Sequence, residues 1–173
     1  MKTLSIPVLL FFILLTHLQG QQEPFSLTIV PHSRSSDLAW IDSGKDSTRT
    51  FFVILKNNTA KPQAVFEQWN SWGYKTISFQ MSLPEGRKVK VTMRDRGFTM
   101  NFPATYVIPA KGYQVFPIVF DQEWSLPTFE KAGLTKIKLK AIYSVDSTDE
   151  STVQKVWVGE VESEAITVEL KHW

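Results

Sequence analysis

Cysteine is absent from the 173-residue chain, and histidine is scarce. Without cysteine there is no disulfide, no thiol nucleophile and no cysteine-ligated metal. Only His32 and His172 follow the first twenty residues, which removes most mechanisms that use a histidine base or ligand. The chain also lacks the G-x-S-x-G, P-loop, H-E-x-x-H and G-x-G-x-x-G motifs. We therefore predict that the protein is not an enzyme and needs no cofactor or metal.

A strong charge of either sign is missing as well. The chain has 19 basic and 17 acidic side chains, and its formal net charge is +2. Nucleic-acid-binding proteins usually carry a concentrated basic surface. The composition therefore gives no reason to expect a nucleic-acid partner.

The one long hydrophobic run lies at the N-terminus. Lys2 precedes the 12-residue apolar run "LSIPVLLFFILL" (4–15), and "THLQG" follows it. This is the layout of a secretory signal peptide, and the run is shorter than the roughly 20 residues of a membrane-spanning helix. We predict a signal peptide at 1–20, one domain at 21–173, and no membrane insertion after cleavage. The expected location is secreted, periplasmic or the cell envelope.

Most of the remaining chain alternates apolar and polar residues with period two, which is typical of half-buried strands. No sustained helical period, internal repeat or low-complexity linker interrupts the pattern. Turn signals recur every 8–12 residues or so, which favours a single antiparallel β-sandwich. A barrel remains the alternative. The expected strands are 25–30, 39–41, 50–57, 64–69, 74–81, 88–93, 105–108, 113–120, 135–145, 153–161 and 165–171.

Some pairings are also predicted. The turn "LPEG" (83–86) indicates that 74–81 and 88–93 form a hairpin, and "PAKG" (109–112) indicates another between 105–108 and 113–120. Pro117 has no N–H to donate, so its strand should lie at an edge or carry a bulge. In 135–145 the residues expected to face the core are Ile137, Leu139, Ala141, Tyr143 and Val145.

Several segments resemble those of a known class. The order "VILKNNTAKP" (53–62) resembles the B–C region of immunoglobulin-like domains, and "KIKLKAIYSV" with "KVWVGEVES" and "AITVEL" resembles their final F–G hairpin. Together with "EQWNSWGY" and the "RGF…NFP" loop, these segments resemble exported immunoglobulin-like β-sandwich proteins of bacteria. The similarity to the bacterial intracellular proteinase-inhibitor sandwich is weaker. The resemblance implies a fold and a compartment but no activity.

The segment "EQWNSWGY" (67–74) allows two interpretations. In the first, Trp69 points into the core and Gly73 marks a bulge or a close backbone approach. In the second, aromatic faces form a platform for a sugar or a peptide, because they offer large contact areas at low entropy cost. The predicted binding residues are Asn70, Trp72 and Tyr74, with Arg96, Phe98, Asn101 and Phe102 from the following loop.

We therefore expect an exported, non-catalytic binding or interaction module whose partner is a protein or a glycan. One alternative is an inhibitor of an exported hydrolase that acts through loop 94–103 or 121–134. A weaker alternative is a glycan-active enzyme with a carboxylate pair. The candidate carboxylates are Glu67, Asp95, Asp121, Glu123, Glu160, Glu162 and Glu164.

Two further expectations concern particular side chains. The acidic residues at 160–164 should form cross-strand ion pairs with the lysines of 135–145. In a eukaryotic protein, Asn57 in "NNT" would be a glycosylation acceptor on a surface turn.

Overall fold

The computed structural model describes residues 23–33, 39–44, 47 and 49–172. The predicted signal peptide lies outside the described residues, so it stays a prediction. The described part contains twelve strands and two short helices. The strands are β1 (Phe25–Val30), β2 (His32–Ser33), β3 (Ala39–Ser43), β4 (Phe51–Asn57), β5 (Gln63–Phe66), β6 (Ile77–Ser82), β7 (Lys88–Thr92), β8 (Thr105–Ile108), β9 (Tyr113–Ile118), β10 (Gly133–Val145), β11 (Gly159–Glu162) and β12 (Ile166–His172). The helices are α1 (Ser71–Tyr74) and α2 (Asp149–Val153).

The smaller of the two main sheets has the order β1-β4-β9, and both of its pairings are antiparallel. Its outer strands, β1 and β9, each have one neighbour in this sheet. Pro117 lies in β9 opposite Phe52 of β4. The prediction that the Pro117 strand is an edge strand is therefore confirmed.

The larger sheet has the order β2-β3-β12-β10-β6-β7, and β11 pairs with β10 beyond the end of β12. All of its pairings are antiparallel except that of β3 with β12, which is parallel. The predicted hairpin of β6 and β7 is confirmed, with Ser78 opposite Thr92 and Ser82 opposite Lys88. A separate two-stranded sheet joins β5 to β8.

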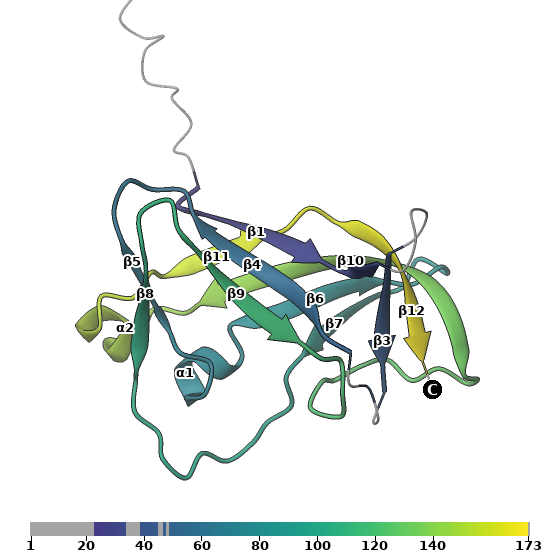
Figure 1. Cartoon of the computed structure of the whole chain (residues 1–173). Coiled ribbons are helices and arrows are strands. Elements are labelled where there is room, and N and C mark those ends of the chain that lie inside the picture. Colours follow the sequence, from purple (N-terminus) through teal and green to yellow (C-terminus); the bar gives the residue numbers. More distant parts are fainter. Residues whose placement is uncertain (1–22, 34–38, 45–46, 48, 173) are drawn as a thin grey trace, which may run out of the picture.

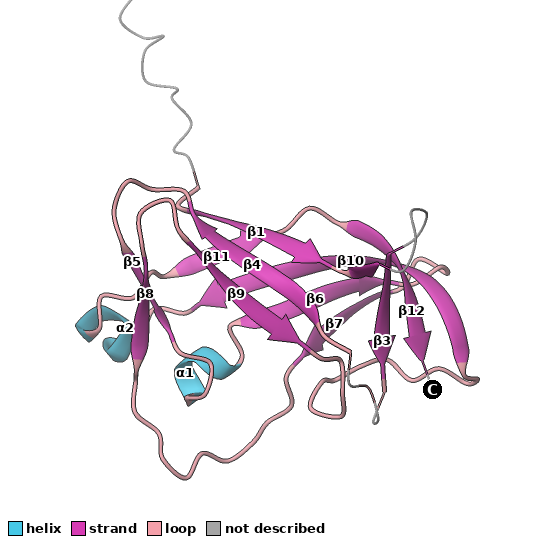
Figure 2. Ribbon diagram, viewed as in Figure 1, coloured by secondary structure: helices cyan, strands magenta, loops and turns pink. Residues whose placement is uncertain are grey.

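The two main sheets face each other, with the hydrophobic core between them (Figures 1 and 2). Aromatic contacts link them directly. The ring centroids of Phe51 in β4 and Phe79 in β6 are 5.7 Å apart, and those of Phe116 in β9 and Tyr143 in β10 are 6.0 Å apart. All five residues of β10 that were predicted to face the core are buried. The expectation of an all-β fold with antiparallel sheets is therefore confirmed.

One predicted pairing is wrong. Strands β8 and β9 do not form a hairpin, because β8 pairs with β5 and β9 pairs with β4. The turn at Lys111, which has φ of 60°, carries the chain from one sheet to another instead.

The connection from β10 to β11 holds helix α2, and β11 pairs antiparallel with β10 but begins only at Gly159, so the strand expected at 153–161 starts later than predicted. Thr148 caps α2 by accepting from the backbone N–H of Ser151, whose side chain accepts in return from the N–H of Thr148. This reciprocal capping satisfies two N–H groups at the start of the helix.

Candidate binding surface

The segment 67–74 folds as a turn followed by the short helix α1, not as a bulge between strands. Asn70 has extended φ and ψ of −97° and 166°, and its side-chain oxygen accepts from the N–H of Gly73 at 2.9 Å. Asparagine is among the preferred residues at this N-cap position. The N–H of Tyr74 bonds to the carbonyl of Asn70 at 2.9 Å, which closes the helical turn.

Gly73 is required here by a close backbone approach. A Cβ atom at this position would lie 2.1 Å from the carbonyl oxygen of Glu67. Real Cβ atoms essentially never approach an oxygen so closely. Any other residue would therefore push α1 away from the turn that precedes it.

Two asparagines fasten the loop 94–104 to α1. The Asn70 side chain donates to the carbonyl of Ala104 at 2.9 Å. Asn101 accepts from the N–H of Ser71 at 2.9 Å and donates to its hydroxyl at 2.8 Å. Asn70 is 0% exposed, and both polar atoms of its side chain are engaged. This corrects the expectation that Asn70 faces a ligand: it holds the loop in place instead.

The two tryptophans of the segment differ in burial. Trp69 was expected in the core, but it is 40% exposed and its ring makes an edge contact with Phe102 at 4.8 Å. Phe102 is itself 57% exposed. Trp72 is half-buried and packs against the core near Phe66. Helix α1 begins between the two tryptophans, so the alternation of a strand does not carry on from Trp69 to Trp72.

Arg96 lies over two aromatic rings. Its guanidinium carbon is 4.1 Å from the ring centroid of Tyr74 and 4.9 Å from that of Phe98. The Tyr74 and Phe98 rings meet edge to face at 5.5 Å. No carboxylate of the described residues forms an ion pair with Arg96. Its charge is therefore held in place by aromatic faces, which leaves its N–H groups available to a partner.

Trp69 in the turn before α1 and four residues of the loop 94–104 are exposed or half-buried. We call this set the loop surface, and its members are Trp69, Arg96, Phe98, Met100 and Phe102. Met100 is 77% exposed. Of the seven predicted binding residues, three belong to this surface. Trp69 and Met100 were missed. Of the other four predicted residues, Asn70, Tyr74 and Asn101 contact or hold this loop, and Trp72 packs against the core.

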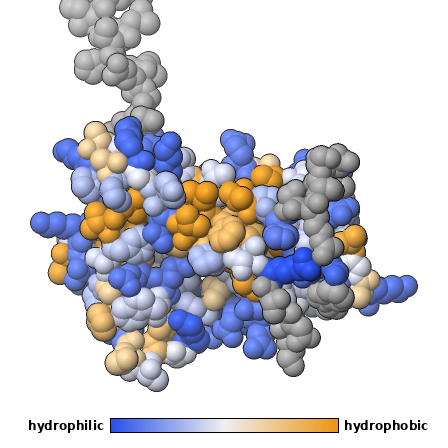
Figure 3. All heavy atoms as spheres, in the orientation of Figure 1, coloured by the Kyte–Doolittle hydropathy of each residue, from blue (hydrophilic) through white to orange (hydrophobic). Residues whose placement is uncertain are grey.

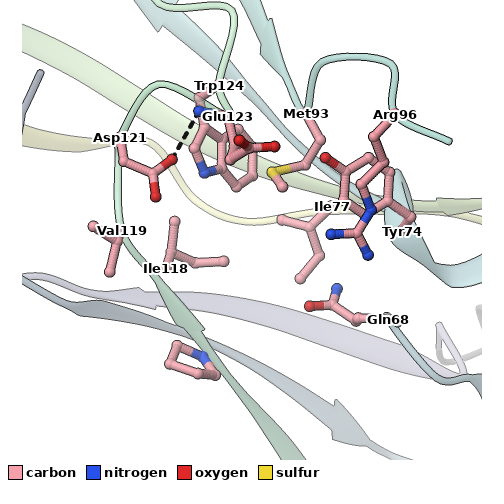
Figure 4. Close-up of a pocket in the computed structure, with 11 residues that line it drawn as sticks. Gln68, Tyr74, Ile77, Met93, Arg96, Ile118, Val119, Asp121, Glu123 and Trp124 are labelled. Carbon is pink, nitrogen blue, oxygen red and sulfur yellow. Dashed lines mark hydrogen bonds between the residues drawn. The ribbon is translucent and has the colours of Figure 1, made fainter. Parts of the chain in front are cut away.

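A cleft of about 310 Å³ lies beside the loop surface and shares Arg96 with it (Figure 4). Its apolar lining comes from β6, β9 and the segments that follow β7 and β9. The apolar members are Ile77, Met93, Pro117, Ile118, Val119 and Trp124, and the polar members are Gln68, Tyr74, Arg96, Asp121 and Glu123.

The Tyr74 hydroxyl is an unusual group in this cleft. The residue is buried, and its oxygen makes no hydrogen bond with any described residue. Burial raises the pKa of Tyr74 above its ordinary value; the Arg96 charge opposes this rise and the Glu123 carboxylate adds to it. The phenol is therefore neutral at physiological pH and able to donate a hydrogen bond.

The candidate carboxylates are distributed over several places, and two of them share the cleft. Asp121 accepts from the N–H of Glu123 at 2.9 Å, so one of its oxygens shapes the loop. Glu162 pairs with Lys140 at 2.7 Å, which confirms one predicted cross-strand ion pair. Glu67 accepts from the indole N–H of Trp69. Asp95 pairs with Lys75.

The prediction of Asn57 as a glycosylation acceptor on the surface is wrong. Asn57 is 0% exposed. Its side-chain nitrogen donates to the carbonyls of Lys61, Ile108 and Pro109 at 2.8 to 3.2 Å. Its oxygen accepts from the N–H and hydroxyl of Thr59. In the folded protein this amide fixes the turn after β4 and is closed to modification.

A second exposed apolar area covers the outer face of the smaller sheet. Val30, Phe52 and Pro117 lie opposite one another across its three strands. All three are exposed. Apolar side chains gather over these strands in the view of Figure 3. This face shares no residue with the loop surface.

Two further features are absent from the described residues. They bring together no group of three His, Cys, Asp or Glu side chains that could hold a metal ion. Both helices in the described part fall well short of the length and apolar character that crossing a membrane requires.

Comparison with known proteins adds no relationship. No family model matches the sequence, and no curated protein is detectably similar to it. The resemblance to exported bacterial immunoglobulin-like proteins therefore stays a prediction.

Proposed function

We propose that the protein is an exported, non-catalytic binding module that recognises a protein or glycan partner through the loop surface. It acts outside the cell, in the periplasm or in the cell envelope, after removal of residues 1–20. The observation that carries this proposal is the exposed edge-to-face pair of Trp69 and Phe102. Two large aromatic side chains left this exposed on loops are typical of recognition surfaces.

The strand order supports an immunoglobulin-like sandwich as the scaffold. The order β12-β10-β6-β7 corresponds to strands G, F, C and C′ of variable-type domains. The order β1-β4-β9 corresponds to A, B and E. The chain has no cysteine pair to join the sheets, and Phe79 of β6 packs there against Phe51, Phe120 and Trp124.

Rigidity of the loop supports a role in binding. Three hydrogen bonds of Asn70 and Asn101 hold the loop 94–104 to the start of α1, and a fourth, from the N–H of Gly73 to Asn70, caps that helix. Arg96 is fixed over two rings. A surface that is ordered before its partner arrives loses less conformational entropy on binding. The aromatic pair and the arginine are therefore well prepared for contact.

The proposal that the protein is not catalytic is supported by the two carboxylates of the cleft. Asp121 and Glu123 are the carboxylates that a glycan-active enzyme would use. Asp121 commits one oxygen to the backbone, and Glu123 is exposed at the rim. A general acid of a glycosidase is typically held in a hydrophobic pocket rather than exposed at a rim.

The test compares the two tryptophans. The full chain is expressed for export, and Trp69→Ala and Trp72→Ala are assayed for capture on an insoluble-polysaccharide panel and on purified exported proteins of the source. Trp69→Ala should lose capture and keep its melting temperature. Trp72→Ala should keep capture and melt several degrees lower. Tyr113→Ala, which removes an exposed aromatic residue from β9, is the matched control. Full capture by Trp69→Ala and loss by Tyr113→Ala would instead place binding on the smaller sheet.

A second candidate function is inhibition of an exported hydrolase by insertion of the loop 94–104. It is favoured by the shape of this loop, which extends beyond the sheets in Figure 1 and has no strand of its own between Arg94 and Ala104. An inhibition assay on a panel of exported proteases and glycosidases tests it. Inhibition that Asn101→Ala weakens, through a less firmly held loop, would favour this function over simple attachment.

A further inference from the structure

Five lysines gather on the outer face of the larger sheet. Lys88 and Lys90 belong to β7, and Lys136, Lys138 and Lys140 belong to β10. Side chains of a strand alternate between its two faces, and the intervening residues of β10 are buried in the core. The lysines therefore share the opposite face, which is turned toward solvent.

Strand β6 runs between these two groups of lysines. Its residue Ser82 lies opposite both Lys88 and Lys138, and Gln80 lies opposite both Lys90 and Lys140. Neighbouring strands are about 4.8 Å apart, and residues two positions apart in a strand are separated by about 6.7 Å. The lysines thus form two rows roughly 10 Å apart, with neutral hydrogen-bonding side chains between them.

This arrangement lines a groove. The cavity measures about 1110 Å³, and its lining includes Gln80, Ser82 and Thr167 together with four of the lysines: Lys88, Lys136, Lys138 and Lys140. The turn between β6 and β7 closes one side with Leu83, Pro84 and Gly86. The groove is separate from the cleft beside the loop surface, with which it shares no lining residue.

The positive charge of the groove is largely unbalanced. Among the described residues, the one ion pair that a groove lysine forms is that of Lys140 with Glu162 at 2.7 Å. Glu169 lies opposite Lys136 in the register of β10 and β12, but the two side chains form no ion pair. A chain with a net charge of only +2 therefore carries a locally basic face.

We propose that this groove binds an anionic polysaccharide along β6, with carboxylate or sulfate groups on the two rows of lysines. This function goes beyond the binding proposed for the loop surface and does not depend on it. The alternation of ammonium groups with the Gln80 amide and the Ser82 and Thr167 hydroxyls matches a polymer that alternates charges with hydroxyl groups. A lysine ammonium is a point charge, so it can bind an anionic group in many orientations, whereas arginine favours bidentate hydrogen bonding.

Other polyanions fit the groove less well. No aromatic side chain belongs to its lining, so the bases of a single-stranded nucleic acid would find no stacking platform. An acidic peptide cannot add as a strand, because β6 already pairs on both sides, with β7 and β10. A carbohydrate needs neither feature.

The experiment measures binding of the full chain, expressed for export, to oligogalacturonate and to dextran sulfate, with neutral dextran as the blank. A groove variant carries Lys88→Gln, Lys136→Gln and Lys138→Gln. A matched variant carries Lys56→Gln, Lys61→Gln and Lys131→Gln, which remove the same charge from exposed positions outside the groove. Thermal unfolding of both variants establishes that they are folded.

We expect the groove variant to bind at least one of the two acidic polysaccharides about tenfold more weakly or worse, since each exposed ion contact contributes a factor of roughly two to five at low salt. The salt dependence of its affinity should also become shallower, because fewer counterions are released. The matched variant should stay within about twofold of the wild type. Carboxylated and sulfated ligands are distinguished by which of the two probes loses more affinity.

Three results would overturn the proposal. The first is absence of wild-type binding to either acidic polysaccharide at low salt. The second is an equal loss in the groove and matched variants, which would mean that net charge alone decides. The third is tighter binding of polyglutamate or oligothymidylate than of both polysaccharides, which would assign the groove to a different class of partner.

Discussion

Removal of the Asn70 side chain should destabilise the protein far more than its small size suggests. Asn70→Ala leaves the buried N–H of Gly73 and the partly buried carbonyl of Ala104 without partners. A buried polar group left unpaired costs about 1–3 kcal/mol, and a partly buried one costs less. We expect the free energy of unfolding to fall by roughly 2–4 kcal/mol, out of the 5–15 kcal/mol typical of a domain.

The assay is urea denaturation followed by tryptophan fluorescence. With a slope of about 2 kcal/mol per molar urea, the midpoint should fall by roughly 1–2 M at an unchanged slope. Asn101→Ala is the comparison, because its hydrogen bonds to Ser71 are exposed and water replaces them. That variant should lose no more than about 1 kcal/mol.

Asn70→Asp separates the two hydrogen bonds. It keeps the oxygen that accepts from Gly73 but loses the nitrogen that donates to Ala104. Asn70→Asp should therefore be more stable than Asn70→Ala only if the bond that caps α1 contributes more than the bond to Ala104. An Asn70→Ala variant as stable as Asn101→Ala would refute the reasoning, because it would show that α1 and the loop are held by other contacts.

Four other outcomes follow from the structure. Gly159→Ala should lower the free energy of unfolding by about 1–3 kcal/mol in urea denaturation, since Gly159 has φ of +144° and a Cβ would lie 2.8 Å from the Trp157 ring. Gly86→Ala, with φ of +85° but open space around it, should cost less. Thr148→Ala should remove about 1 kcal/mol through the lost cap of α2, measured by the same titration. Burial raises the folded-state pKa of Tyr74, Tyr106 and Tyr143. The free energy of unfolding should therefore not depend on these three phenols below about pH 10, and above it should fall by at most about 1.4 kcal/mol per pH unit for each of them, because they ionise first in the unfolded chain. The phenolate absorbance of these tyrosines should appear together with unfolding.

Period-two alternation predicted most of the strands because burial on one face leaves a local trace in the sequence. The inward residues of β10 and the hairpin of β6 and β7 follow directly from it. Pairing partners leave no such trace unless a short turn joins them. The turn before β9 was therefore mistaken for a hairpin, although β8 pairs with β5 across a long stretch of chain.

Both helices were missed because one or two turns are too short to show a 3.6-residue period. Their local signals were nevertheless present: Asn70 stands three residues before Gly73, and Thr148 stands three residues before Ser151. The same oversight placed Trp69 in the core, since a strand was assumed where a helix begins. The association of 70–74 with the loop near Asn101 was predicted correctly, from proximity in sequence and type of residue.

The groove of lysines could not be predicted from composition, because a net charge sums over the whole surface. Only the order β10-β6-β7 brings lysines of two distant segments to the same face. The cleft was missed for a similar reason. Glu123 and Arg96 come from loops whose proximity depends on how β7 and β9 are placed.

The 13 residues of β10 have a consequence for the order in which the chain folds. One side of this strand pairs with β6, but its other side pairs first with β12 and then with β11, both of which come after it in the sequence. A growing chain that ends before Gly159 therefore exposes one full edge of β10, together with the side chains that β12 would cover. Such an edge invites pairing with other chains. The larger sheet is complete only after β12 has been synthesised. Until then the free edge of β10 stays exposed, and the nascent chain needs protection from aggregation.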